Sequence, residues 1–139
     1  PAQRRNNRIQ GDGHGGAFIT FQDLRNGFDY DIYVQHISST GQYLWGGNAI
    51  KVCGAVGAQT DPKIDPEPSI GGCFLVWIDK RNGLDYDIYA QKVDSNGNCI
   101  WQADGKPVVT APGNQTAQDF SSNGGVNGLI TVYLKSKKN

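Results

Sequence analysis

One acidic block occurs twice in the chain, and it holds the residue types most able to do chemistry. Its copies run from Asp23 to Gln35 and from Asp79 to Gln91, with the shared pattern Asp-x-Arg-Asn-Gly-x-Asp-Tyr-Asp-Ile-Tyr-x-Gln. Several carboxylates on one short loop provide the oxygen ligands that Ca²⁺ prefers. The candidate calcium ligands are Asp23, Asp29, Asp31, Asp79, Asp85 and Asp87.

An arginine inside each copy favours a different interpretation. Arg25 and Arg81 follow the first aspartate of their block by two residues, where a guanidinium can form a bidentate pair with a carboxylate. A built-in cation competes with a metal for the same oxygens. We therefore favour self-contained turns with Arg–Asp pairs, and we predict no bound metal and no cofactor.

The aromatic residues allow two interpretations, a sugar-stacking platform or internal packing. They are Trp45, Trp77 and Trp101, with Tyr30, Tyr33, Tyr86 and Tyr89. In repeat proteins such side chains more often fill the space between neighbouring units, so we favour packing.

The sequence shows no catalytic constellation. His14 and His36 are solitary and lie far apart in the repeat frame, and no Ser/His/Asp or Cys/His pattern recurs. We therefore predict that the protein is not an enzyme.

Three cysteines leave at least one thiol unpaired within the chain. In an antiparallel four-stranded unit, the first-to-second and third-to-fourth turns lie at the same end. Cys73 follows the first of these turns and Cys99 lies in the other, so any intrachain disulfide is predicted to join them. Cys53 would then be free or intermolecular. Asn114, in Asn-Gln-Thr, is a candidate for N-glycosylation.

The 139 residues are predicted to form one domain, 1–139, with 13 basic and 13 acidic side chains. This balance argues against nucleic acid as a partner, and no apolar run approaches the ~18 residues of a membrane span. The chain begins at Pro1 without Met, which suits either a processed mature secreted protein or a chain that was trimmed at its start. We therefore expect an extracellular or cell-surface location.

The second acidic block begins 56 residues after the first, at 79 against 23, and many other residues share this offset. It predicts a repeat at about 1–56, a second at about 57–113 and a partial third at about 114–139. Alternating apolar residues and Asn-Gly turns predict an all-β fold with essentially no helix. Four short strands per repeat, with Lys63–Asp65 as a short strand among prolines, is the size of a β-propeller blade.

The second copy carries Gly-Gly-x-Phe-x-x-Trp-x-Asp-x-Arg-x-Gly-x-x-x-Asp-Ile-Tyr-x-Gln, followed by Gly97 and Trp101. This pattern resembles the repeats of bacterial extracellular β-propeller-like proteins. The resemblance covers residues 12–126 and part of the third copy, and the first copy departs from it with Phe21 in place of Trp77. It implies tandem four-stranded blades and a secreted binding or structural module, with no particular ligand.

The partial third copy suggests how such a chain would function. Its apolar segment, Leu129 to Tyr133, lacks the hairpin partner found in the second copy and is predicted to be an unpaired strand that joins a neighbouring subunit. The predicted interface residues are Leu129, Ile130, Val132 and Tyr133. We expect a self-assembling structural protein, a subunit of an extracellular filament or homo-oligomer whose partners are copies of itself. The alternative is a lectin-like module that binds carbohydrate or protein.

Overall fold

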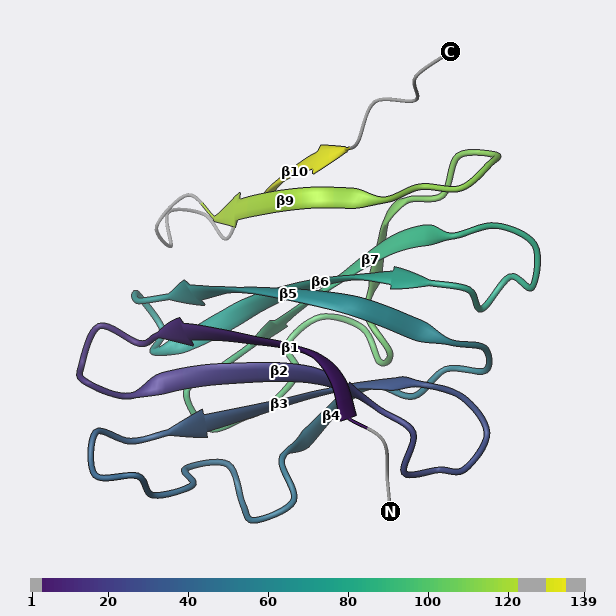
Figure 1. Cartoon of the computed structure of the whole chain (residues 1–139). Coiled ribbons are helices and arrows are strands. Elements are labelled where there is room, and N and C mark those ends of the chain that lie inside the picture. Colours follow the sequence, from purple (N-terminus) through teal and green to yellow (C-terminus); the bar gives the residue numbers. More distant parts are fainter. Residues whose placement is uncertain (1–3, 123–129, 135–139) are drawn as a thin grey trace.

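The computed structural model describes residues 4–122 and 130–134, and it is all-β (Figure 1). This part of the chain forms two four-stranded antiparallel sheets and one two-stranded hairpin, and none of the three closes on itself. Over the same residues, the structure has no helix with the length and apolar character needed to cross a membrane.

Each four-stranded sheet is a meander, in which strands that follow one another in the chain are neighbours. The first sheet consists of β1 (Arg4–Gly11), β2 (Ala17–Asp23), β3 (Asp31–Ile37) and β4 (Ile50–Cys53). The second consists of β5 (Gln59–Glu67), β6 (Gly72–Asp79), β7 (Asp87–Val93) and β8 (Lys106–Val109). In each central hairpin the glycine of the Asn-Gly pair takes a positive φ, +82° at Gly27 and +76° at Gly83. Residues with a Cβ atom avoid positive φ angles for steric reasons, which explains the glycine at each turn.

The central hairpins of the two sheets have the same register. Phe21 pairs with Tyr33 in the first sheet, and Trp77 pairs with Tyr89 in the second, both residues 56 positions further on. Because the side-chain period of a strand is two, the same register places equivalent side chains on equivalent faces.

The first strands depart from the offset of 56. Arg4 and Gln59 hold equivalent pairing positions in β1 and β5, 55 residues apart, because the second unit has one more residue between equivalent positions, with Pro66 paired to Cys73 where Gly11 pairs with Ala17. The prediction of a short strand limited to Lys63–Asp65 was wrong, since β5 has 9 residues. A register shift between Thr60 and Lys63 takes up Pro62, and β5 is an edge strand, where a missing N–H is tolerated.

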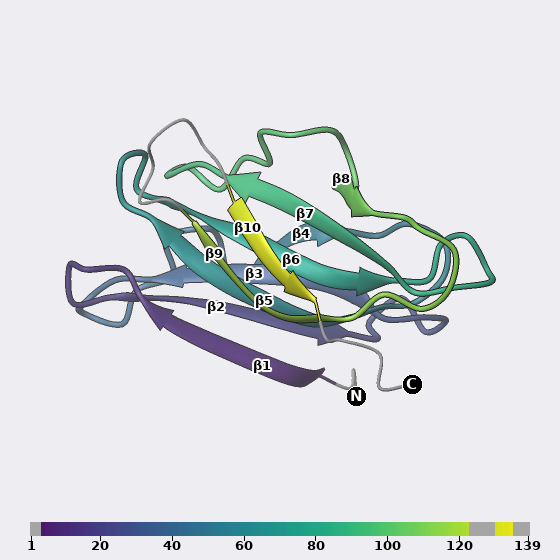
Figure 2. The ribbon, with the colours of Figure 1, turned by 90° about the horizontal axis from the view of Figure 1, so that it is seen from above.

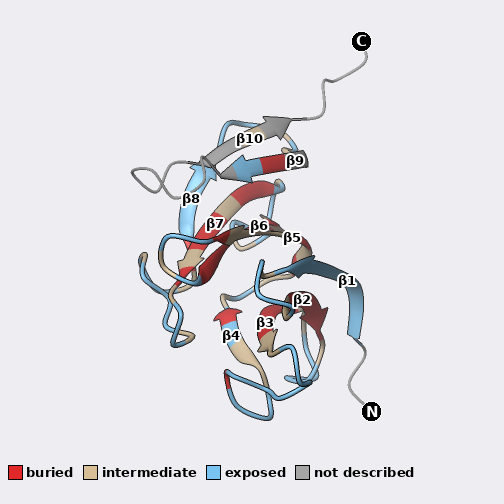
Figure 3. Cartoon of the chain, turned by 90° about the vertical axis from the view of Figure 1, so that its left-hand side faces the viewer, coloured by how far each residue is buried: buried red, intermediate tan, exposed pale blue. Residues whose placement is uncertain are grey.

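The two sheets stack face to face and enclose the larger core (Figures 1 and 3). Phe18, Ile32 and Val34 of the first sheet pack against Leu75 and Trp77 of the second. All five side chains are at most 2 % exposed. The hydrophobic effect of burying these side chains is the main force that holds the two sheets together.

A hairpin of β9 (Ala117–Ser122) and β10 (Ile130–Leu134) covers the other face of the second sheet (Figures 1 and 2). The prediction of an unpaired strand was wrong for Ile130 to Tyr133, because β10 pairs with β9 of its own chain. The short segment 117–122 provides the missing partner. Leu129, the remaining predicted interface residue, lies outside the described residues.

The β9–β10 hairpin packs on the second sheet through a different face from the one that the second sheet turns toward the first. Val132 lies 56 residues after Val76, and Val76 points away from the first sheet toward the hairpin. Val132 and its pairing partner Phe120 instead point back toward the second sheet. The hairpin therefore covers the second sheet with the face opposite to the one that the repeat predicts.

Candidate functional site

The acidic block holds the central hairpin to a neighbouring loop through an Asp–Arg–Tyr interaction, which we call the lock. Asp79 is fully buried and accepts hydrogen bonds from the Trp77 indole at 2.9 Å and from the Arg81 guanidinium at 2.9 and 2.6 Å. The same guanidinium stacks 3.7 Å from the centre of the Tyr89 ring and donates to the Asp104 carbonyl at 2.7 Å. The predicted Arg–Asp pairing is confirmed here, and it ties the central hairpin to the loop before β8.

The first copy repeats this lock with fewer bonds to the carboxylate. Arg25 donates to Asp23 at 2.7 Å and to the Asn48 carbonyl at 3.0 Å, and it lies 3.8 Å from the centre of the Tyr33 ring. Where Trp77 stands in the second copy, Phe21 has no N–H to donate, and the exposed Arg4 side chain donates to Asp23 instead at 3.1 Å.

The remaining candidate calcium ligands also have structural partners. Asp29 accepts from the Gly57 N–H at 2.9 Å, and Asp85 accepts from the Gly113 N–H at 2.8 Å. Each bond fixes a hairpin to the linker that leads to the next strand. Among the residues that the structure describes, no group of three or more His, Cys, Asp or Glu side chains is arranged to hold a metal ion.

Asp31 and Asp87 are also buried. Each accepts from the preceding asparagine, Asn26 at 3.2 Å and Asn82 at 3.0 Å, and each keeps one buried oxygen without a partner. Burial raises the pKa of both carboxyls, and the neighbouring carboxylates Asp29 and Asp85 raise it further.

The packing interpretation is confirmed for three of the seven aromatic residues, while Tyr30, Tyr89 and Trp101 are half-buried and Tyr86 is exposed. Trp77 is 0 % exposed, Trp45 is 6 % and Tyr33 is 7 %. Gln35 holds the Trp45 loop by accepting from the Trp45 N–H at 3.2 Å, and Gln91 does the same for Trp101 at 2.9 Å. The glutamine that ends each block therefore positions a tryptophan.

The two histidines are not far apart in the structure, because both contact Asp12. The His14 N–H donates to Asp12 at 2.7 Å, and His36 Nε2 lies 2.9 Å from the same carboxylate. The hydrogen bonds from His36 and His14 lower the pKa of Asp12. His36 Nδ1 is buried without a hydrogen-bond partner, and the ring stacks on Phe18 with ring centres 4.2 Å apart.

The predicted disulfide is not formed, since Cys53, Cys73 and Cys99 are all free thiols. Cys73 pairs with Val93 on one side and Cys99 bridges to Val93 on the other. Two strand spacings place their Cα atoms about 9–10 Å apart, beyond the span of a disulfide. Asn114, the glycosylation candidate, is exposed, and its side-chain oxygen accepts from the Tyr86 N–H at 3.0 Å.

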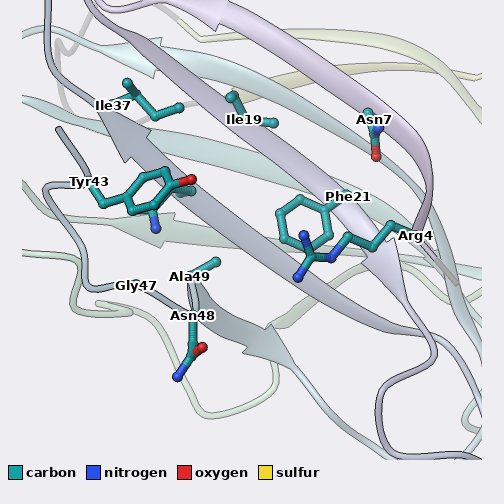
Figure 4. Close-up of a pocket in the computed structure, with 10 residues that line it drawn as sticks. Arg4, Asn7, Ile19, Phe21, Ile37, Tyr43, Gly47, Asn48 and Ala49 are labelled. Carbon is teal, nitrogen blue, oxygen red and sulfur yellow. The ribbon is translucent and has the colours of Figure 1, made fainter. Parts of the chain in front are cut away.

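The candidate site is the face of the first sheet that points away from the second sheet, which we call the open face. Ile19, Phe21 and Ile37 lie on it, and Tyr43 at its rim is 62 % exposed. Figure 4 shows these side chains around a hollow of about 220 Å³. Arg4, Asn7 and Asn48 add polar groups to its lining.

Sequence reasoning did not identify the open face, although the repeat contains the signal. Ile19, Phe21 and Ile37 are equivalent to Leu75, Trp77 and Val93, which lie buried beneath the first sheet. Aligning the two copies and asking which neighbour covers each face would have exposed the difference.

No protein-family model, curated protein or solved structure matches this chain. The resemblance to bacterial extracellular β-propeller-like repeats therefore rests on the repeated residues alone.

Proposed function

We propose that this chain is a non-catalytic assembly module whose open face binds a second copy by stacking one sheet on another. One observation carries the proposal, the correspondence between the open face and the covered face of the second sheet. Leu75, Trp77 and Val93 are 0 % exposed in that covered face. Their equivalents on the open face are similarly apolar, and apolar surface of this kind stabilises association when it leaves water.

The expected affinity is modest. Complete burial of an exposed Ile or Phe side chain contributes roughly 1.5–3 kcal/mol. The gain here is smaller, because Phe21 is already only 7 % exposed and Ile19 and Ile37 are half-buried. Association also loses translational and rotational freedom, which costs at least about 4 kcal/mol. We therefore expect a dissociation constant in the micromolar range.

The contact we propose is heterologous, because the open face of one copy meets a different face of the next. Such a contact gives a ring when the rotation closes and a filament when it does not. Either product fits a structural subunit that assembles from copies of itself.

Sedimentation velocity over about 1–100 μM tests the proposal, because a micromolar constant produces association within that range. The variant Ile19→Asp places a carboxylate in the middle of the open face and is expected to weaken association about 100-fold or more. Leu84→Asp is the matched control, because Leu84 is 83 % exposed at a hairpin tip away from this face. Circular dichroism confirms that both variants are folded.

A chain that remains monomeric over the whole range would overturn the proposal. Association that Ile19→Asp leaves unchanged would overturn it too.

One observation favours carbohydrate binding as a second candidate function. Tyr43 presents an exposed ring at the rim of a hollow that Asn48 and Arg4 also line (Figure 4), and aromatic faces with planar polar groups suit sugar rings. A glycan array with the intact chain and with Tyr43→Ala separates the two candidates. Glycan binding that depends on Tyr43 in a monomeric chain would favour the second.

A further inference from the structure

Trp45 and Trp101 hold equivalent positions but differ in how far they are covered. Trp45 donates its indole N–H to the Ser95 carbonyl at 3.0 Å and is 6 % exposed. It thereby anchors the first sheet to the turn between β7 and β8. Trp101 packs on Phe74, with ring centres 5.7 Å apart, but remains only partly buried.

The β8 side of the second sheet, which we call its outer half, is also less covered than the corresponding part of the first sheet. Val52 in the first sheet is 3 % exposed, whereas its equivalent Val108 is 40 % exposed. The β9–β10 hairpin lies over β5 and β6 and leaves β8 outside it (Figures 2 and 3). Trp101 and Val108 therefore form an apolar surface that the hairpin does not cover.

The first sheet carries a counterpart of the turn that receives Trp45. Residues 38–42 and 94–98 form the same turn, closed by N–H to carbonyl bonds of 2.9 Å from Ser38 to Gln42 and from Asp94 to Asn98. Gly97 makes room for the indole, because a Cβ atom there would lie 3.0 Å from Trp45. The equivalent Gly41 has the same φ of +82°, and among the described residues nothing lies within 4 Å of a Cβ atom at that position.

A second pair of positions extends this correspondence. The Gly54 N–H donates to the Asp104 side chain at 2.9 Å, joining the two sheets at the end of β4. The equivalents of Gly54 and Asp104 are Thr110 and Asn48, both exposed. Asn48 retains a side-chain oxygen that can accept this bond, and it lines the hollow of the open face (Figure 4).

The hairpin occupies part of the space that such a neighbour would need. β9 lies beside β5 as β5 lies beside β1, so a first sheet stacked in the same register would overlap it. Phe120 and Val132 hold the hairpin there on the apolar cluster of the second sheet.

Building on the proposed function, we infer that the partner surface is the outer half of the second sheet of another copy, with Trp101 seated against the Ser38–Gln42 turn. The contact repeats the junction that the chain makes between its own two sheets. The β9–β10 hairpin competes with the incoming copy for the same face and so limits assembly.

Cysteine cross-linking of the full chain tests this register. In a Cys99→Ser background, the double variant Asn48→Cys/Thr110→Cys is expected to form covalent dimers and higher multimers on oxidation. Neither single variant should do so, because the contact joins two different positions. Trp101→Ala in the same background is expected to reduce the yield about tenfold, the effect of losing roughly 1.4 kcal/mol of binding energy.

The hairpin's role is tested in the double-cysteine background with Phe120→Ser. Loosening the hairpin is expected to raise the cross-linked yield several-fold at fixed concentration. Val132→Thr, a milder change, should shift it in the same direction, and circular dichroism verifies that the sheets remain intact.

The outcomes separate this inference from the proposed function. If the chain associates in the ultracentrifuge but the double variant forms no covalent multimers, the inferred contact is wrong and the proposed assembly still holds. Equal cross-linking in the single variants would have the same meaning. Yields that neither hairpin variant raises overturn the competition. A chain that does not associate at all overturns both.

Discussion

Among individual side chains, the acidic blocks join three kinds of interaction in one place. An aspartate accepts from an arginine, the arginine lies over a tyrosine ring, and its remaining N–H reaches a loop carbonyl. Buried charges are stable only when they are paired and hydrogen-bonded, and here both conditions are met. The repetition of this block therefore has a structural explanation that requires no metal and no ligand.

The two copies of the lock provide a matched pair of substitutions. Asp79→Asn is expected to lower the free energy of unfolding by about 3–5 kcal/mol, because it leaves the Arg81 guanidinium without its buried counter-ion. Asp23→Asn should cost less, about 1–2 kcal/mol, because Asp23 lacks an indole donor and one of its arginines, Arg4, is exposed. Urea denaturation of both variants measures the difference, and an equal loss in the two would contradict it.

The strands and turns show how the chain accommodates local exceptions. β5 carries Pro62 within a register shift that β1 also has, between Arg5 and Arg8, and the connection from β5 to β6 has one residue more than its counterpart between equivalent paired positions. The strand order of the two sheets is nevertheless the same. The junctions after the sheets also correspond. The Gln59 N–H donates to the Tyr30 carbonyl at 2.7 Å, and the Gln115 N–H donates to the Tyr86 carbonyl at 2.6 Å.

Gly72, at the start of β6, is a position where close approach demands glycine. A Cβ atom there would collide with the Val93 carbonyl of the neighbouring strand, whose backbone cannot move freely. Gly72→Ala is expected to destabilise the protein by about 1–3 kcal/mol. Gly47→Ala is the control, since among the described residues nothing lies within 4 Å of its Cβ position. Thermal unfolding of the two variants should separate them, and similar midpoints would refute the steric argument.

Across the whole molecule, each layer packs against the next through apolar side chains. The first sheet covers one face of the second, and the hairpin covers part of the other. The open face has no such neighbour among the described residues, and this asymmetry underlies the proposed assembly.

Trp45 contacts both four-stranded sheets, so its removal should destabilise both of them. Trp45→Ala is expected to lower the free energy of unfolding by about 3–5 kcal/mol, as for other buried aromatic residues. We expect one cooperative transition in which circular dichroism and the fluorescence of the remaining tryptophans coincide. Tyr43→Ala, at an exposed site close in sequence, should change stability little. Two separate transitions in the unmodified protein would show that the sheets unfold independently.

Local chemistry determined much of this protein. Alternating apolar residues and Asn-Gly turns predicted an all-β chain with antiparallel hairpins, and the spacing of Arg25 from Asp23 and of Arg81 from Asp79 predicted their pairing. These features depend on backbone angles and on side chains a few residues apart, which a single sequence displays directly.

Only the tertiary structure decided which faces are covered and which segments meet. Both faces of these strands are apolar, so alternation alone could not distinguish the covered face of the second sheet from the open face of the first. The pairing of β10 with β9, and the meeting of His14 and His36 at Asp12, depend on contacts between residues distant in the chain. Stacking is set by long-range shape and burial, for which the sequence carries no local signal.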